Sequence, residues 1–397
     1  MNHPGQQFIN RLNQIYPEII EIRRQFHKYP ELSFQEHKTS QFICEKLNEY
    51  NIPYDDGIAG TGIVAQIKGK NPSHKIIALR ADMDALPVNE SNELEYKSER
   101  QGIMHACGHD VHLAVLLGTA RILNELKHDL EGSIILIFQP GEEKIPGGAK
   151  QMIEEGVLEN PKPDIILGLH VMPGLETGKV AFAPGKIMAS ADEIYIKVKG
   201  KGGHAALPDE LIDPILIASY LITSLQQVVS RNANPATPCV LSFGKIEGCG
   251  AANIIPGEVN LSGTLRTMNE EWREKAHRII VNLCQSITSG MGGSCDVEIR
   301  KGYPFLENNE YITSKARAYA ENLLGKENVT DLKMEMTAED FAYYAQIIPA
   351  TFYLLGITNK EEGNNMPLHS PDFMVDEKAL ITGISTMTWI TLEFLKD

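Results

Sequence analysis

Long apolar runs, cysteine and positive charge are all scarce in this chain of 397 residues. Its longest apolar stretches, such as SIILIF and DIILGL, fall far short of the roughly 20 residues that a membrane-spanning helix needs. The first residues also lack the basic and apolar regions of a signal peptide. The six cysteines are spread over the whole chain, which predicts reduced thiols rather than a disulfide framework. We therefore expect a cytoplasmic protein with no membrane partner.

Charge and composition limit both the partners and the architecture. Asp and Glu number 52 against 37 Lys and Arg, so the formal net charge at pH 7 is -15. An acidic surface repels phosphate backbones, which argues against nucleic acid as a partner. A hydrophobic content of 43% is ordinary for a globular protein, and the length exceeds the about 250–300 residues that one core supports. Two domains are therefore expected.

The pattern of apolar residues changes twice along the chain. Residues 1–185 and 301–397 alternate short apolar runs with helical spacings, which predicts an α/β domain with a mixed sheet flanked by helices. Between them, residues 186–300 read as strand, helix, two strands, helix and strand. This β-α-β-β-α-β order is the split βαβ, or ferredoxin-like, pattern of a small two-layer domain. We expect this small domain to be inserted into a discontinuous larger one.

Metal-capable side chains follow the predicted strands at their C-terminal ends. The ends of four such strands carry Asp82 and Asp84, Glu142 and Glu143, His170, and His369. Open α/β sheets bind ligands at that edge, so we expect these residues to share one site. Cys107 and His109 precede a helix predicted over 110–127, and residues two apart in an extended segment project to the same side. Thiolate, imidazole and carboxylate together suit Zn²⁺ or a similar divalent ion.

Each of these residues has a plainer interpretation when it is taken alone. Cys107 would be a small buried apolar residue, and His105 and His112 would be packing histidines. The Glu142–Glu143 pair would be two solvated charges. As a set they favour hydrolysis, because one carboxylate of the pair can ligate a metal while the other takes a proton from metal-bound water. Spacing alone does not assign these two roles.

Two other functions fit part of the pattern. Cys107 with a nearby histidine as its base would make a thiol hydrolase. A closed zinc site would make a non-catalytic scaffold, but the sequence has no second Cys-x-x-Cys type of knuckle to close one. Chelation separates the thiol hydrolase from the metal hydrolase, because a thiol hydrolase survives EDTA and a metal hydrolase does not.

The motifs also make the sequence similar to a known family. They are RRQFHKYPELSFQE (23–36), ALRADMDALPV (78–88), MHACGHDVHLAVLLG (104–118), FQPGEE (138–143), GLHVMPGLETG (168–178), GKGGHAALPDELIDPI (200–215), NIIPGEVNLSGTLRT (253–267) and LHSPDF (368–373). On these stretches the chain resembles the M20 metallopeptidase family, in the amidohydrolase branch that includes hippurate hydrolases and auxin-conjugate hydrolases. The stretches cover nearly the whole chain in order, and HACGHD with a distant PGEE is a specific signature.

The resemblance implies a two-metal, aminopeptidase-like catalytic domain with two divalent ions per subunit, either zinc, manganese, nickel or cobalt. Glu142 is then the general base, which activates the bridging water and later protonates the leaving amine. The ligands that the resemblance implies are Cys107 as a bridge between both ions, Glu143 and His369 on one ion, and His109 and His170 on the other.

The resemblance also makes the inserted domain a dimerisation lid, so a homodimer is expected. By the same carry-over, His204 in GGHAALP stabilises the oxyanion, often across the dimer. Asn253 and Arg266 match positions that hold the carboxylate or carbonyl of the substrate, and an arginine fork suits a carboxylate.

Two departures from the wider family place the chain in the amidohydrolase branch. Peptidase branches have His-x-Asp where this chain has Asp82, Met83 and Asp84, and an aspartate where it has Cys107. The first difference argues against Asp82 as a ligand and makes Asp84 a carboxylate that orients a ligand histidine. The expected reaction is cleavage of an N-acyl amino acid, a small-molecule substrate, to a carboxylate and a free amino acid. A metallo-dipeptidase, an aminopeptidase and an N-acetyl-amino acid deacetylase are the alternatives within the family.

Overall fold

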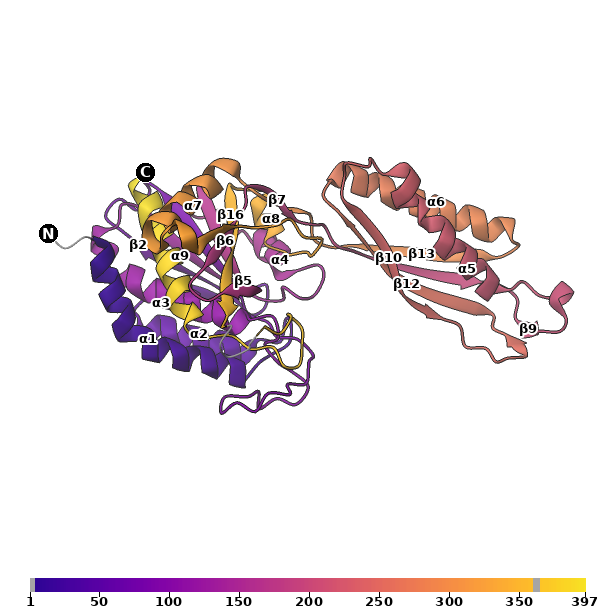
Figure 1. Ribbon diagram of the computed structural model, residues 1–397, viewed down its shortest axis with the longest axis horizontal. Coiled ribbons are helices and arrows are strands. Elements are labelled where there is room, and N and C mark those ends of the chain that lie inside the picture. Colours follow the sequence, from indigo (N-terminus) through magenta and orange to yellow (C-terminus); the bar gives the residue numbers. More distant parts are fainter. Residues whose placement is uncertain (1–3, 360–364) are drawn as a thin grey trace. The chain divides into compact units, whose positions relative to one another are not determined.

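Residues 4–359 and 365–397 are described by a computed structural model, in which the chain divides into two units (Figure 1). The first unit holds the residues up to Ile187 together with Glu307–Lys333 and Asp340–Asp397. The second unit holds Met188–Leu306 and Met334–Glu339. Within the described ranges, none of the helices has both the length and the apolar character that crossing a bilayer requires.

A mixed sheet of eight strands forms the centre of the first unit. Its strands lie in the order β1 (Tyr54–Ile58), β2 (Gly62–Lys68), β4 (Ser133–Gln139), β3 (Ile76–Asp82), β5 (Ile165–Glu176), β16 (Ala350–Thr358), β6 (Val180–Phe182) and β15 (Val329–Asp331). The four central strands β4, β3, β5 and β16 are parallel to one another, whereas β2 and β6 run antiparallel to their inner neighbours. Every residue of β4 is buried, as expected for a strand that is covered on both faces.

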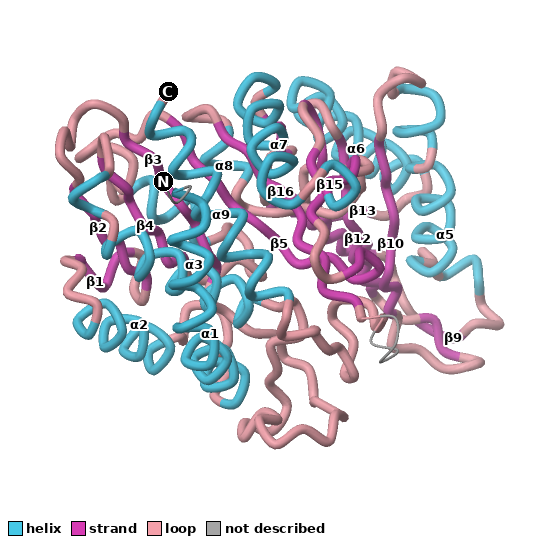
Figure 2. The backbone as a smooth tube through the Cα atoms, turned by 60° about the vertical axis from the view of Figure 1, so that its left-hand side comes forward, coloured by secondary structure: helices cyan, strands magenta, loops and turns pink. Residues whose placement is uncertain are grey.

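Helices flank this sheet. They are α1 (Pro4–Lys28), α2 (His37–Glu49), α3 (His109–Glu125), α4 (Gly148–Glu154), α7 (Glu310–Leu324), α8 (Ala342–Ala345) and α9 (Ala379–Lys396). Figure 2 shows α1, α3 and α9 side by side, and their buried apolar residues join those of the sheet in one core. Helix α1 contributes Ile15, Ile19, Ile22 and Phe26, which recur at the spacing of one helical face. The expected α/β fold with a mixed sheet flanked by helices is confirmed.

The second unit is a smaller sheet with two helices. Its chain order is β8 (Asp192–Lys199), α5 (Pro214–Leu225), β10 (Cys239–Glu247), β12 (Glu258–Thr267), α6 (Glu270–Gly290) and β13 (Ser294–Lys301). The strands lie in the order β10-β12-β8-β13, and all three pairings are antiparallel. Ile194, Ile196 and Val198 alternate with more exposed residues in β8, so one face of the sheet is buried against the helices.

Local sequence signals begin the two helices of this unit. The Asp213 side chain accepts hydrogen bonds from the backbone N–H groups of Ile215 and Leu216 at the start of α5. Asn269 accepts one from Trp272 at the start of α6. Both are preferred N-cap residues, because their side-chain oxygens satisfy N–H groups that have no partner within the helix. Short strands complete the fold, with β9 (Gly203–His204) paired to β11 (Ile254–Ile255) and β7 (Gly185–Met188) paired to β14 (Leu306–Asn308).

Candidate metal centre

Five metal-capable side chains of the first unit come together near the ends of its parallel strands. They are Cys107 before α3, His109 at its first position, Glu143 after β4, His170 in β5 and His369 after β16. The ligand atoms of Cys107, His109 and His170 lie within 4.8 Å of one another, and so do those of Cys107, Glu143 and His369. The Sγ atom of Cys107 is 3.4 Å from Nε2 of His170. Cys107 is therefore common to two groups of three ligands.

His170 is not at the end of its strand, contrary to the sequence prediction. Strand β5 continues to Glu176, and His170 pairs with Leu354 of β16 in mid-strand. The residues of β5 before His170 are all buried, whereas most of those after it are partly exposed. The apolar pattern stops at His170 although the backbone pairing goes on, which explains why the end was predicted too early.

The geometry around His109 leaves one ring nitrogen facing the cluster. Its Nδ1 lies 2.8 Å from the backbone oxygen of Asp84, so Nδ1 carries the proton and Nε2 is the atom that could bind a metal ion. That Nε2 is buried and has no hydrogen-bond partner among the described residues. Gly108, which precedes it, has a φ of +82°, and a Cβ there would lie 2.5 Å from Val171. Glycine thus lets the start of α3 approach β5 closely.

His369 reaches the cluster from an exposed loop in a strained conformation. Its φ is +64°, which is uncommon for a residue other than glycine. Its backbone N–H donates to the oxygen of Ala106 over 2.8 Å, and its Nε2 is 3.3 Å from Oε1 of Glu143. Backbone strain of this kind is found at functional sites, where neighbouring contacts hold it in place.

The electrostatics of the cluster fit a divalent cation. Burial and the carboxylates of Glu143 and Glu142 raise the pKa of the Cys107 thiol well above its ordinary value. A cysteine nucleophile needs the opposite shift. Burial also disfavours a charged His109, yet Asp82 and Asp84 outweigh it and raise its pKa to about 10. Since the site holds more carboxylate than compensating charge, a cation suits it and would favour the thiolate.

Asp84 orients two parts of the site at once. Its carboxylate oxygens accept the backbone N–H groups of Glu142 and Glu143, each over 3.0 Å. One of them is also 3.4 Å from Nδ1 of His109. Burial opposes ionisation of Asp84, but these donors together with Ser33 lower its pKa. Glu142 is buried, and its carboxylate accepts the backbone N–H of Asp340 over 3.4 Å.

Asp82 has structural partners on both oxygens. Its Oδ1 is 2.6 Å from Nδ1 of His112, and its Oδ2 is 2.7 Å from Nη1 of Arg80. The other amino group of Arg80 binds Asp340 over 2.7 Å, and Gln139 donates to the same aspartate over 2.8 Å. Sequence reasoning missed this buried network, although an arginine inside the apolar strand KIIALRAD was a signal for it.

A second buried network is centred on Asp110, the residue after His109. Asp110 is 2.8 Å both from Nε of Arg23 and from Nδ1 of His27, two residues of the early motif RRQFH. His105 is also buried, and neither of its nitrogens has a hydrogen-bond partner among the described residues. Burial lowers the pKa of His105 to about 3, and it joins no group of metal-capable residues within the described chain.

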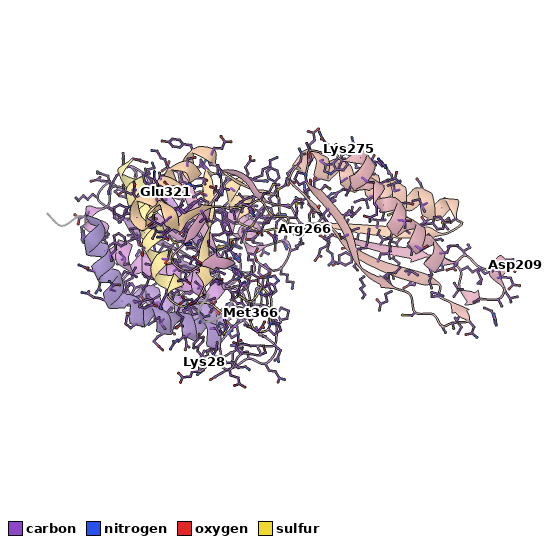
Figure 3. The ribbon with its side chains drawn as sticks, in the orientation of Figure 1. Lys28, Asp209, Arg266, Lys275, Glu321 and Met366 are labelled. Carbon is purple, nitrogen blue, oxygen red and sulfur yellow. The ribbon has the colours of Figure 1, made fainter. Side chains whose placement is uncertain are left out.

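The remaining predicted residues lie in the second unit. His204 in β9 and Asn253 are both exposed and close together, because Ile254 pairs with His204. Arg266 is half-buried on β12 and donates to Oγ1 of Thr264 over 3.2 Å. Figure 3 labels Arg266 at the opposite end of this unit from Asp209, which follows His204 in the chain.

Comparisons with known proteins point in the same direction as this geometry. The sequence matches Peptidase family M20/M25/M40 over residues 78–392. N-acetyl-L-cysteine deacetylase of Bacillus subtilis (strain 168) is 40% identical over 370 residues, which cover 93% of this chain and 86% of that protein. IAA-amino acid hydrolase ILR1-like 4 of Arabidopsis thaliana is 38% identical over 395 residues, which cover 97% and 87%. The solved structure of the Bacillus subtilis YXEP protein, a dinuclear metal-binding peptidase from the M20 family, has a TM-score of 0.82 at 32% identity, and the match covers 97% of this chain and 99% of that one.

Proposed function

This chain belongs to peptidase family M20/M25/M40, and on that premise we propose that its catalytic centre is the cluster around Cys107. The protein is a metal-dependent hydrolase of the amide bond in N-acyl amino acids, which it cleaves to a carboxylate and a free amino acid. The observation that carries the assignment of the site is that two groups of ligand atoms share Cys107. Glu142 lies beside His109 and Glu143, one member of each group.

The donor set supports two divalent ions, with zinc, manganese, nickel or cobalt as candidates. Such ions act as Lewis acids toward an amide carbonyl and lower the pKa of water toward neutrality. The residues that would hold them are Cys107 for both, Glu143 and His369 for one, and His109 and His170 for the other. Asp84 keeps His109 in the correct tautomer, since the backbone oxygen of Asp84 accepts the proton of Nδ1.

Glu142 is the proposed general base. Its carboxylate is buried beside the ligand residues His109 and Glu143, and its backbone is held by Asp84. It takes a proton from the attacking water and returns one to the nitrogen of the leaving amino acid. A carboxylate in this role contributes about 10²–10⁴-fold to the rate.

The second unit is the proposed lid and dimerisation domain. In the sequence it is inserted between segments of the proposed catalytic domain, which is therefore discontinuous. The order of its elements and the order of its strands support a ferredoxin-like topology. Helix α5 exposes Ile215, Leu216 and Tyr220 at 42–55% of their full surface. Apolar side chains gathered in this way favour association, which supports a homodimer.

The proposed catalytic residue of this lid, His204, and the proposed substrate-binding residue Arg266 lie at two different ends of it. His204 pairs with Ile254, just before β12 begins, whereas Arg266 lies near the other end of that strand. A strand rises about 3.3 Å per residue, so the eight steps from Glu258 to Arg266 span about 26 Å. One small substrate cannot touch both residues of one chain. We therefore propose that His204, with Asn253, and Arg266 of one chain serve two different sites of the dimer. His204 stabilises the oxyanion at one site, and Arg266 binds the substrate carboxylate at the other.

The test is hydrolysis of a panel of N-acyl amino acids that includes N-acetyl, long-chain and aromatic acyl groups and one dipeptide. EDTA is expected to abolish activity, and added Zn²⁺, Mn²⁺, Ni²⁺ or Co²⁺ to restore it. Activity that survives full chelation, together with a covalent adduct on Cys107 seen by mass spectrometry, would establish a thiol hydrolase instead. Comparison of acetyl with longer acyl groups and with the dipeptide separates deacetylase, aminoacylase and dipeptidase activity.

A further inference from the structure

Glu36 is a buried carboxylate that stands before a helix but does not cap it. It is the residue immediately before α2, where a side chain commonly accepts the first N–H groups of the helix. Its side chain makes no such bond. Glu31 does this instead, since its Oε2 accepts the N–H groups of Lys38 and Thr39 over 2.7 and 2.9 Å. Helix α2 is therefore capped without Glu36.

The Glu36 carboxylate is turned toward the segment that carries Glu142. Its Oε1 accepts the backbone N–H of Gly141 over 2.9 Å and that of Phe34 over 2.8 Å. Its Oε2 accepts the hydroxyl of Thr61 over 2.7 Å. Glu36 is completely buried, so both oxygens depend on these donors rather than on solvent.

Glu36 and Asp84 together bind three successive N–H groups of one turn. Gly141 donates to Glu36, and Glu142 and Glu143 donate to Asp84. Two carboxylates thus hold the backbone of this turn. The side chains of the proposed base Glu142 and of the proposed metal ligand Glu143 project from it. Charge-assisted hydrogen bonds of this kind are about twice as strong as neutral ones.

The loop that carries Glu36 also contacts the same turn through Phe34. Gly141 has a φ of +59°, and a Cβ placed on it would lie 2.4–2.7 Å from atoms of the Phe34 ring. Phe34 itself has a φ of +64°. Ser33, one residue earlier, donates its hydroxyl to Asp84 over 2.6 Å. Residues 33–36 therefore contact the turn through the ring of Phe34 and the carboxylate of Glu36. Ser33 and the turn also bind the same aspartate, Asp84.

We propose that Glu36 is a positioning residue, which fixes the peptide of Gly141 so that the carboxylates of Glu142 and Glu143 keep their places. The proposal rests on the proposed function, because it is Glu142 as base that gives the turn its importance. Groups held in a reactive arrangement lose about 100-fold in rate when they are displaced by about 1 Å. Removal of the acceptor for Gly141 is expected to act in this way.

The experiment compares Glu36→Ala with Glu36→Gln in the full-length, metal-loaded protein. Alanine leaves three donors without an acceptor, and kcat is expected to fall about 100-fold while KM changes less than about threefold. Glutamine keeps an oxygen for Gly141 and Phe34 and offers an N–H to the Thr61 hydroxyl. Its kcat is therefore expected to stay within about threefold of the wild type, which a loss of buried charge as such would not predict.

Glu31→Ala is the matched control, because it removes a buried carboxylate from the same loop. Among the described residues, that carboxylate binds the start of α2 and the partly exposed Arg100. The Glu31→Ala substitution is expected to lower the melting temperature at least as much as Glu36→Ala and to leave kcat within about threefold. If Glu36→Ala does not fold, Glu36→Asp keeps the charge but withdraws the oxygens from Gly141, and a kcat about tenfold lower is expected.

Two outcomes overturn the proposal. One is a Glu36 variant, alanine or aspartate, that turns over at the wild-type rate, and the other is a Glu31→Ala protein that loses kcat to the same extent. Glu142→Gln, assayed in parallel, separates this failure from failure of the proposed function. An active Glu142→Gln protein refutes the general base, whereas an inactive one beside fully active Glu36 variants refutes only the positioning role.

Discussion

The imidazole of His112 donates from Nδ1 to Oδ1 of Asp82 over 2.6 Å, with both side chains buried. The direction of this bond follows from the other nitrogen, because Nε2 accepts the backbone N–H of Val171 over 3.0 Å. Burial lowers the pKa of His112 to about 4, so the ring is neutral at physiological pH. The bonds join the end of β3, through α3, to the residue that follows His170. Asp82 thus supports the arrangement of the site.

Replacement of His112 by Phe should destabilise the protein by about 1–3 kcal/mol. The ring volume is kept, but one oxygen of Asp82 and the N–H of Val171 lose their buried partners. Urea unfolding followed by circular dichroism measures the change. His74→Phe, at an exposed position, is the control and should be nearly neutral. An unchanged midpoint for His112→Phe would show that these bonds contribute little.

The two adjacent glutamates should separate into two phenotypes. Glu142→Gln should lower kcat by about 10²–10⁴-fold and leave the metal content unchanged, because Glu142 is the proposed base and not a proposed ligand. Glu143→Gln should lower the metal content, because a carboxylate ligand is replaced by a weaker amide. Steady-state kinetics and metal analysis of the same preparations test both statements. Equal metal loss in the two variants would contradict the assignment.

Cys107→Ala should lose both metal and activity, since the thiol contributes to both ligand groups. Cys249→Ala changes an exposed cysteine and should retain both. Metal content after extensive dialysis, measured by mass spectrometry, is the direct observation. A Cys107→Ala protein that keeps both ions at the wild-type stoichiometry would rule out a shared sulfur ligand.

Mixed dimers should show whether His204 acts across the subunit interface. Neither the His204→Ala nor the Glu142→Gln homodimer should be active. If His204 serves the partner's site, a dimer of one subunit of each kind has one complete site, and mixing should restore about half the activity per dimer. If His204 serves its own subunit, no complete site forms. Co-expression with two affinity tags isolates the mixed dimer for assay.

The second unit should lose stability in acid through Asp192. This buried carboxylate accepts hydrogen bonds from Nε of Arg273 over 2.9 Å and from the N–H of Gly302, and it is 2.6 Å from Nε2 of His277. Burial opposes its ionisation, but His277 and Arg273 lower its pKa below the unfolded value of 3.8. A carboxyl group whose pKa is lowered by folding contributes stability that is complete above its unfolded pKa of 3.8. This stability is lost as the pH falls through the pKa of the group in the folded protein.

Asp192→Asn should therefore lower the free energy of unfolding of the second unit by about 3–5 kcal/mol at neutral pH. The difference from wild type in this free energy should shrink below pH 3.8. Trp272 belongs to the core of the second unit, and Trp389 is the other tryptophan of the chain. In a Trp389→Phe background, fluorescence thus reports on this unit alone. A difference between the two proteins that does not change with pH would show that the Asp192 charge is not responsible.

Much of the architecture follows from local sequence. Continuous apolar runs produce the buried strands β3 and β4, and alternating residues such as Ile194 and Ile196 produce the half-exposed strand β8. Asp213 before Pro214 begins a helix for reasons contained in those two residues. The ends of parallel strands meet at one edge of a sheet, so the grouping of Glu143 with Asp84 and His369 could be predicted from the order of the elements. The place of His170 within β5 could not, because backbone pairing continues beyond the apolar residues.

The sequence by itself thus determined the layers and the order of the elements, and it predicted most of the residues of the candidate metal centre. Only the tertiary structure decided which oxygen meets which donor. Arg80 and Asp340 are 260 positions apart, and Glu36 and Gly141 are 105 positions apart, yet each pair is within hydrogen-bonding distance. No periodicity records such contacts, because periodicity reflects burial of a face, whereas a buried hydrogen bond depends on distance and direction between single atoms.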